Sequence, residues 1–67
     1  MLTLNDIRQG SKVILRPSFG TGTPIEVTVS ELVENIKNNQ DGIEYRHKGA
    51  TGFSWAYLTQ IDEVVKF

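Results

Sequence analysis

The segment IEVTV alternates apolar and polar residues without interruption. Ile25, Val27 and Val29 occupy every second position, and Glu26 and Thr28 lie between them. Successive side chains of a β-strand point to opposite faces, so this spacing predicts a strand with one buried face and one solvated face. The β-branched residues favour the same conformation. The chain therefore contains at least one strand of a half-buried sheet.

The same period of two recurs along the chain, and clusters of glycine, proline and asparagine separate the repeats. After a single turn near the start, we predict strands at 12–16, 43–48, 53–58 and 61–67. The stretch SFGTGTP reads as a loop and GATG as a turn. Five short strands with tight turns in 67 residues predict one mainly β domain, 1–67, folded as a small barrel or rolled sheet.

The segment SELVENIKNNQ permits two interpretations. Ser30 could cap a short helix over about residues 30–39, which would make the fold α+β. Alternatively, Ser30 and Glu31 form a bulge and the strand continues through Leu32 and Ile36. We favour the strand, because β-branched residues are frequent here and NNQDG is typical of a hairpin loop.

The composition excludes several ways of stabilising or using a small domain. A chain of 67 residues builds a core worth about 3–5 kcal/mol, and such domains often add disulfides, metals or partner subunits. With no cysteine and one histidine, His47, neither a disulfide nor a metal site is expected, and no cofactor is expected either. Self-association remains as an added source of stability.

The chain start, MLTLNDIRQG, lacks the basic and apolar regions of a signal peptide, and no stretch is long enough for a membrane span. We therefore expect a cytoplasmic protein without a membrane partner. Seven basic and eight acidic residues leave the chain nearly neutral, which lowers the expectation of a general nucleic-acid binder.

Catalytic residues are not expected. His47 lies between Arg46 and Lys48, where a solvated strand residue is the simpler interpretation. Asp62 and Glu63 are adjacent, so a strand would turn them to opposite faces, where they could not act together. The sequence therefore predicts that the protein is not an enzyme.

Aromatic residues are the most informative candidates for a binding site. Phe53, Trp55 and Tyr57 stand two apart, so a strand would aim all three rings at the same side. The rings could point inward, because so small a domain needs large residues in its core, or outward as a surface patch. We favour a split, with Phe53 mostly covered and the other two rings at least partly exposed. Tyr45 and Phe19 complete the predicted partner-binding set.

The order of these features resembles a small SH3-like barrel. IRQGSKVILRP is similar to the opening of such domains, and GFSWAYLTQIDEV is similar to their close, where a one-turn corner leads into the last strand. Phe19, Gly20 and Gly22 resemble the Phe-Gly-x-Gly stretch of the Tudor-like tail of bacterial helicases. Type II dihydrofolate reductase has the same architecture, but its Val-Gln-Ile-Tyr signature is replaced by SWAY, so its activity is not implied.

The sequence therefore favours a non-catalytic binding module that contacts a protein partner, or a second copy of itself, through Trp55 and Tyr57. The alternative is a nucleic-acid accessory protein that uses the same rings with a weak basic face, predicted at Lys12, Arg16, Arg46 and Lys48. A subunit of an oligomeric enzyme with a shared pore is a distant third.

Overall fold

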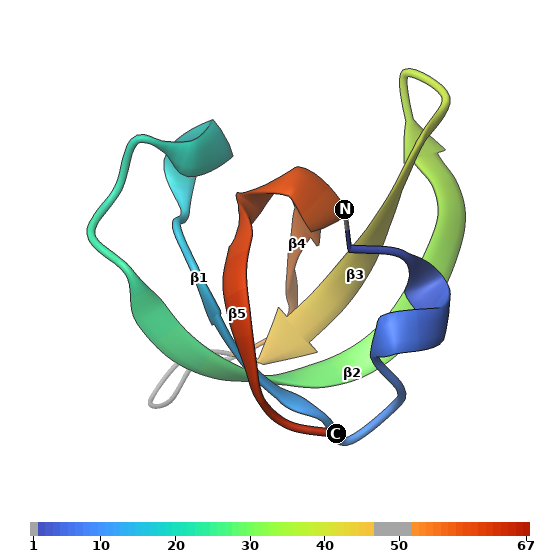
Figure 1. Ribbon diagram of the computed structural model, residues 1–67. Helices are drawn as coiled ribbons and strands as arrows, with labels where there is room; N and C mark the ends of the chain where they lie inside the picture. The colour runs from blue at the N-terminus through green and yellow to red at the C-terminus, as the bar shows by residue number, and fades with distance from the viewer. Residues whose placement is uncertain (1, 47–51) are drawn as a thin grey trace.

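The computed structural model describes residues 2–46 and 52–67, and this part of the chain is mainly β (Figure 1). Five antiparallel strands form one sheet in the order β4-β3-β2-β1-β5. The strands are β1 (Lys12–Leu15), β2 (Ile25–Lys37), β3 (Gln40–Arg46), β4 (Ser54–Tyr57) and β5 (Ile61–Lys66). Three single 3₁₀ turns accompany the strands: η1 (Leu4–Asp6) precedes β1, η2 (Ser18–Gly20) lies between β1 and β2, and η3 (Leu58–Gln60) lies between β4 and β5. The prediction of a mainly β fold is confirmed.

Strand β2 resolves the ambiguity of the segment after Val29. It is 13 residues long and continues through Ser30 to Lys37, so the alternative of a helix at 30–39 is wrong. The pairing of β2 with β3 shifts between Val29 and Glu31, which places a bulge where the sequence suggested one. Bulges bend a strand and increase its twist. Figure 1 shows β2 curving beneath the molecule, with β1 and β3 on its two sides.

The β2–β3 hairpin turns through two asparagines. Asn38 and Asn39 have φ angles of 55° and 60° and lie between the paired residues Lys37 and Gln40. Two central residues with positive φ define the type I′ turn, whose twist matches that of the flanking strands. The hairpin predicted from NNQDG is confirmed.

The core lies inside the curve of the sheet. The inward positions of the alternating segments are filled by aliphatic residues, and Ala56, Leu58 and Ile7 close the ends. The buried hydrophobic residues are Ile7, Val13, Leu15, Val27, Val29, Ile43, Tyr45, Ala56 and Leu58. Ile14 faces the other side of β1 and is half-buried.

Strands β4 and β5 lie at the two ends of the sheet, and over the described residues they are not paired with each other. The described sheet therefore has two edges and is not closed into a barrel. No helix in residues 2–46 and 52–67 is long and apolar enough to cross a membrane. His47 and Lys48, which the sequence analysis considered, lie outside the described residues.

Candidate functional site

Three aromatic rings from two distant segments meet on one side of the molecule. We call Phe19 of η2 together with Trp55 and Tyr57 of β4 the aromatic cluster. The ring centroids of Phe19 and Trp55 are 6.0 Å apart, those of Phe19 and Tyr57 6.2 Å, and those of Trp55 and Tyr57 5.1 Å. The two pairs that include Trp55 are edge-to-face, which is a favourable arrangement for aromatic rings.

The aromatic cluster is exposed. Phe19 is 71% exposed, Trp55 is 38% exposed and Tyr57 is half-buried. The prediction that Trp55 and Tyr57 share a face and are partly exposed is confirmed. Adjoining exposed rings on a small domain form an apolar surface of the kind that marks an interaction site.

The prediction that Phe53 is mostly covered is wrong, because this side chain is 58% exposed. Phe53 precedes the first residue of β4, Ser54, so the face assignment of the strand does not extend to it. Its ring instead packs against the guanidinium of Arg46, which lies 4.9 Å from the ring centroid. Phe53 therefore lies outside the aromatic cluster.

The backbone that carries Phe19 is strained. Phe19 has φ 58° and ψ 31°, and the preceding Ser18 has φ 56°. The left-handed conformation costs roughly 1–2 kcal/mol for a residue with a side chain. Backbone strain of this kind is concentrated at functional sites, where the surrounding structure enforces it. A bulky ring is thus held in solvent at a conformational cost.

Local hydrogen bonds enforce this conformation. The carbonyl of Pro17 accepts from the backbone N–H of Gly22 at 2.9 Å, and the hydroxyl of Thr21 donates to the carbonyl of Ser18 at 2.7 Å. A Cβ atom at Gly22 would lie 2.9 Å from Cγ of Pro17, so only glycine allows this close approach. The loop SFGTGTP is therefore a folded element that presents Phe19.

Gln60 connects this loop to the corner that follows β4. Its side chain is buried, with Nε2 donating to the carbonyl of Arg16 at 2.9 Å and Oε1 accepting from the N–H of Tyr57 at 2.9 Å. Sequence reasoning missed this residue, because a glutamine in a short corner has no pattern that distinguishes it from a solvated one. Gln60 fixes the segment that carries Phe19 relative to the strand that carries Trp55.

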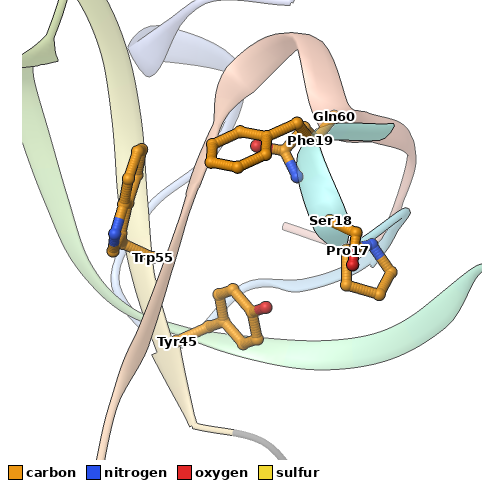
Figure 2. Close-up of a pocket in the computed structure, with 6 residues that line it drawn as sticks. All are labelled: Pro17, Ser18, Phe19, Tyr45, Trp55 and Gln60. Atoms are coloured by element: carbon orange, nitrogen blue, oxygen red, sulfur yellow. The ribbon is translucent and has the colours of Figure 1, made fainter. Parts of the chain in front are cut away.

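A small pocket opens beside the aromatic cluster. It has a volume of about 100 Å³ and is lined by Pro17, Ser18, Phe19, Tyr45, Trp55 and Gln60. Figure 2 shows the rings of Trp55 and Phe19 on two sides of this pocket and the ring of Tyr45 on a third. Tyr45 is only 5% exposed, so it contributes to the site as a wall of the pocket and belongs to the core as well.

Polar groups from the β2–β3 hairpin border the aromatic cluster. The ammonium of Lys37 lies 5.9 Å from the ring centroid of Trp55, and Nδ2 of Asn38 donates to the hydroxyl of Tyr57 at 3.1 Å. Neither contact could be anticipated from the sequence, since each depends on how far β2 curves. A polar rim around a patch of rings is the usual anatomy of a protein interface.

The predicted basic face is brought together only in part. Thr28 pairs with Lys12 on one side and with Arg46 on the other, so these two cations lie in one row across the sheet. Arg16 instead donates from Nε to both carboxylate oxygens of Asp62, at 3.0 and 3.3 Å. Lys48 lies outside the described residues.

Acidic side chains lie beside that row. Glu26 and Glu63 both pair with Ile14, on the same face of the sheet and two positions along from Lys12. The described part of this face therefore carries charges of both signs.

The pocket offers both aromatic and hydrogen-bonding surfaces. Its pocket combines three rings with the hydroxyls of Ser18 and Tyr45 and the amide of Gln60. Among residues 2–46 and 52–67, no three histidine, aspartate or glutamate side chains gather into a possible metal site. Such a pocket suits an apolar side chain flanked by hydrogen-bonding groups. No protein-family model, curated protein or solved structure matches this chain.

Proposed function

We propose that this chain is a non-catalytic binding module of SH3-like architecture that contacts a protein partner through the aromatic cluster, centred on Trp55 and Tyr57. The observation that supports it most is the exposed ring of Phe19, which a strained backbone holds against the two rings of β4. The chain holds this ring at a conformational cost and leaves most of its surface in water, although burial of apolar surface is favourable.

The proposed architecture is consistent with the described strands. The sheet order, the one-turn corner η3 between β4 and β5, and the loop between β1 and β2 are features that such a fold has. In this frame the loop with η2, the corner η3 and strand β4 converge on one side, which is where the pocket lies. Architecture alone does not define a function, so the proposal depends on the site.

A partner with side chains that fill the pocket fits the site better than a nucleic acid does. The ammonium of Lys37 is the basic group that contacts a ring of the aromatic cluster, and the net charge of the chain is −1. Nucleic-acid binding at aromatic platforms is accompanied by a positively charged groove along the backbone of the nucleic acid. The mixture of Glu26 and Glu63 with Lys12 does not provide one.

The test is affinity selection from a display library of random peptides against the full chain. We expect it to yield peptides that bind the native protein and lose at least about tenfold in affinity against Trp55→Ala, as hot-spot aromatic residues do. Phe67→Ala is the matched control, because Phe67 is 55% exposed and packs against Arg8 rather than against the aromatic cluster. Thermal unfolding of both variants establishes that they are folded.

Three results would contradict the proposal. The first is a selection that yields no Trp55-dependent peptide. The second is equal loss of binding in the Phe67→Ala control. The third is binding of single-stranded oligonucleotides that depends on Trp55 and weakens steeply with salt. Counterion release at several phosphate contacts lowers affinity by ~10³-fold or more between 50 and 200 mM salt. That last result would identify a nucleic-acid accessory protein instead.

A further inference from the structure

Strand β4 is an edge of the sheet, and its register shows which backbone groups face outward. β4 pairs with β3 over four consecutive positions without a shift: Gly42 with Tyr57, Ile43 with Ala56, Glu44 with Trp55, and Tyr45 with Ser54. In an antiparallel ladder, residues alternate between those that exchange hydrogen bonds with the neighbouring strand and those whose N–H and C=O point away from it. One residue whose N–H direction is known therefore gives the direction of every backbone N–H and C=O in β4.

Tyr57 is a residue whose N–H direction is known. Its backbone N–H donates to Oε1 of Gln60 at 2.9 Å, so it points away from β3. Two positions earlier in the same ladder, Trp55 must have the same orientation. Ala56 agrees with this, because its carbonyl oxygen is so close to Gly42 of β3 that a Cβ atom there would collide with it. The N–H and C=O of Trp55 therefore face the outer edge of β4.

The pocket lies at this edge. Trp55 is on one face of the sheet, and Tyr45, which pairs with Ser54, is on the other. A pocket that both side chains line must pass around the edge of β4, because β3 and β4 separate the two faces elsewhere. Ser54 points to the same face as Tyr45 and is exposed, so the described residues do not cover its side chain at this edge.

Resting on the binding function above, we propose that the partner supplies an extended peptide segment that adds to β4 as a further strand. The residue opposite Trp55 exchanges two hydrogen bonds with the N–H and C=O of Trp55. Its neighbour along the segment points to the face of Tyr45 and places an apolar side chain in the pocket. Main-chain pairing gives such strand addition its affinity, and pockets for alternate side chains give its specificity.

The β4 edge of a second copy fits this site less well. Two β4 strands that paired around Trp55 would offer each other Ser54 and Ala56 at the neighbouring positions. These side chains are too small to fill a pocket of about 100 Å³. A leucine or phenylalanine on a separate segment is large enough to fill it, so a peptide partner fits the site better.

The experiment is an N-methyl scan of the tightest Trp55-dependent peptide from the display library, measured against the full native chain. N-methylation removes one backbone donor at a time and leaves the side chains unchanged. We expect a loss of about tenfold at the peptide residue opposite Trp55, whose N–H donates to the carbonyl of Trp55, and changes within about twofold at its two neighbours. These neighbours serve as the matched controls, because their N–H groups point away from β4.

A second measurement observes the protein instead of the peptide. Hydrogen exchange of the Trp55 amide should slow at least about tenfold when the peptide is bound. Equal effects of N-methylation at the residue opposite Trp55 and at its neighbours, combined with unchanged exchange at Trp55, would overturn strand addition while leaving the binding function intact. A selection that yields no Trp55-dependent peptide would overturn both. A Trp55-dependent homodimer detected by light scattering would assign the edge to a second copy and overturn the peptide partner.

Discussion

Gln60 and Arg16 are joined by two hydrogen bonds that run in opposite directions. The N–H of Arg16 donates to the carbonyl of Gln60 at 2.9 Å, and Nε2 of Gln60 donates to the carbonyl of Arg16 at 2.9 Å. The second bond depends on a side chain and the first does not. Because Gln60 also accepts from Tyr57, one buried amide holds the loop of η2, the corner η3 and the end of β4 together.

Replacing Gln60 by alanine should lower the free energy of unfolding by about 2–3 kcal/mol. The carbonyl of Arg16 and the N–H of Tyr57 lose partly buried hydrogen bonds, and each buried group left without a partner costs about 1–3 kcal/mol. Urea unfolding measures the change, and Thr59→Ala, at the exposed neighbouring position, is the control. Equal stability of Gln60→Ala and Thr59→Ala would show that water replaces the amide.

Gly42 should not tolerate alanine. A Cβ atom at this position would collide with the carbonyl oxygen of Ala56 and lie 2.7 Å from Cγ2 of Ile36. Inserting an atom into such a site costs about 1–3 kcal/mol, a large share of the stability of a domain this small. Denaturant titration checks this expectation.

The double variant Gly42→Ala, Ile36→Ala tests which neighbour obstructs the added Cβ atom. The second substitution removes Cγ2 of Ile36, but the carbonyl oxygen of Ala56 remains in place. The double variant should therefore regain little of the stability that Gly42→Ala loses. Full recovery in the double variant would mean that the strand can move and that the carbonyl is not an obstacle.

The hairpin turn should be improved by glycine. Asn39 has a φ of 60° in a type I′ turn, where asparagine followed by glycine is the preferred pair. We expect Asn39→Gly to raise the free energy of unfolding by about 0.5 kcal/mol, and Asn39→Ala to lower it by about 1 kcal/mol. Thermal unfolding compares the two variants. The reverse order would mean that the turn does not adopt positive φ in solution.

Substitutions of Phe19 should change stability and peptide binding in different ways. Phe19→Gly should be more stable than Phe19→Ala by about 1 kcal/mol, because glycine adopts the left-handed conformation without strain. Both variants should lose peptide binding, because both remove a ring of the aromatic cluster. Urea unfolding and peptide titration measure the two effects.

Thr21 provides the matched control for this comparison. Its φ of −96° lies in the right-handed region, so there glycine should be less stable than alanine. If glycine were also less stable than alanine at position 19, the strain at Phe19 would not exist in solution.

The strands of this fold could be predicted because their signal is local. In IEVTV and IEYR, inward and outward residues alternate, and the structure buries Val27, Val29, Ile43 and Tyr45 as that pattern requires. The hairpin was recognisable because asparagine tolerates positive φ. The shared face of Trp55 and Tyr57 follows from the same period of two.

The rest of the site depends on contacts between distant segments, which no local pattern encodes. Phe53 was expected to be covered, but the strand begins one residue later and Arg46 provides a surface contact instead. Phe19 in η2 and Trp55 in β4 are far apart in the sequence and meet only once the sheet has formed. The amide of Gln60 acts across the fold on Arg16, and its role appears only when both segments are in place.

Trp55 is the single tryptophan of the chain, and it lies within the aromatic cluster with more than a third of its surface in water. The protein therefore carries its own optical probe at the proposed site. A ligand that covers this indole should shift its emission to shorter wavelength, without any label. Every step of recognition, from first contact to release, is thereby open to stopped-flow spectroscopy on the native chain.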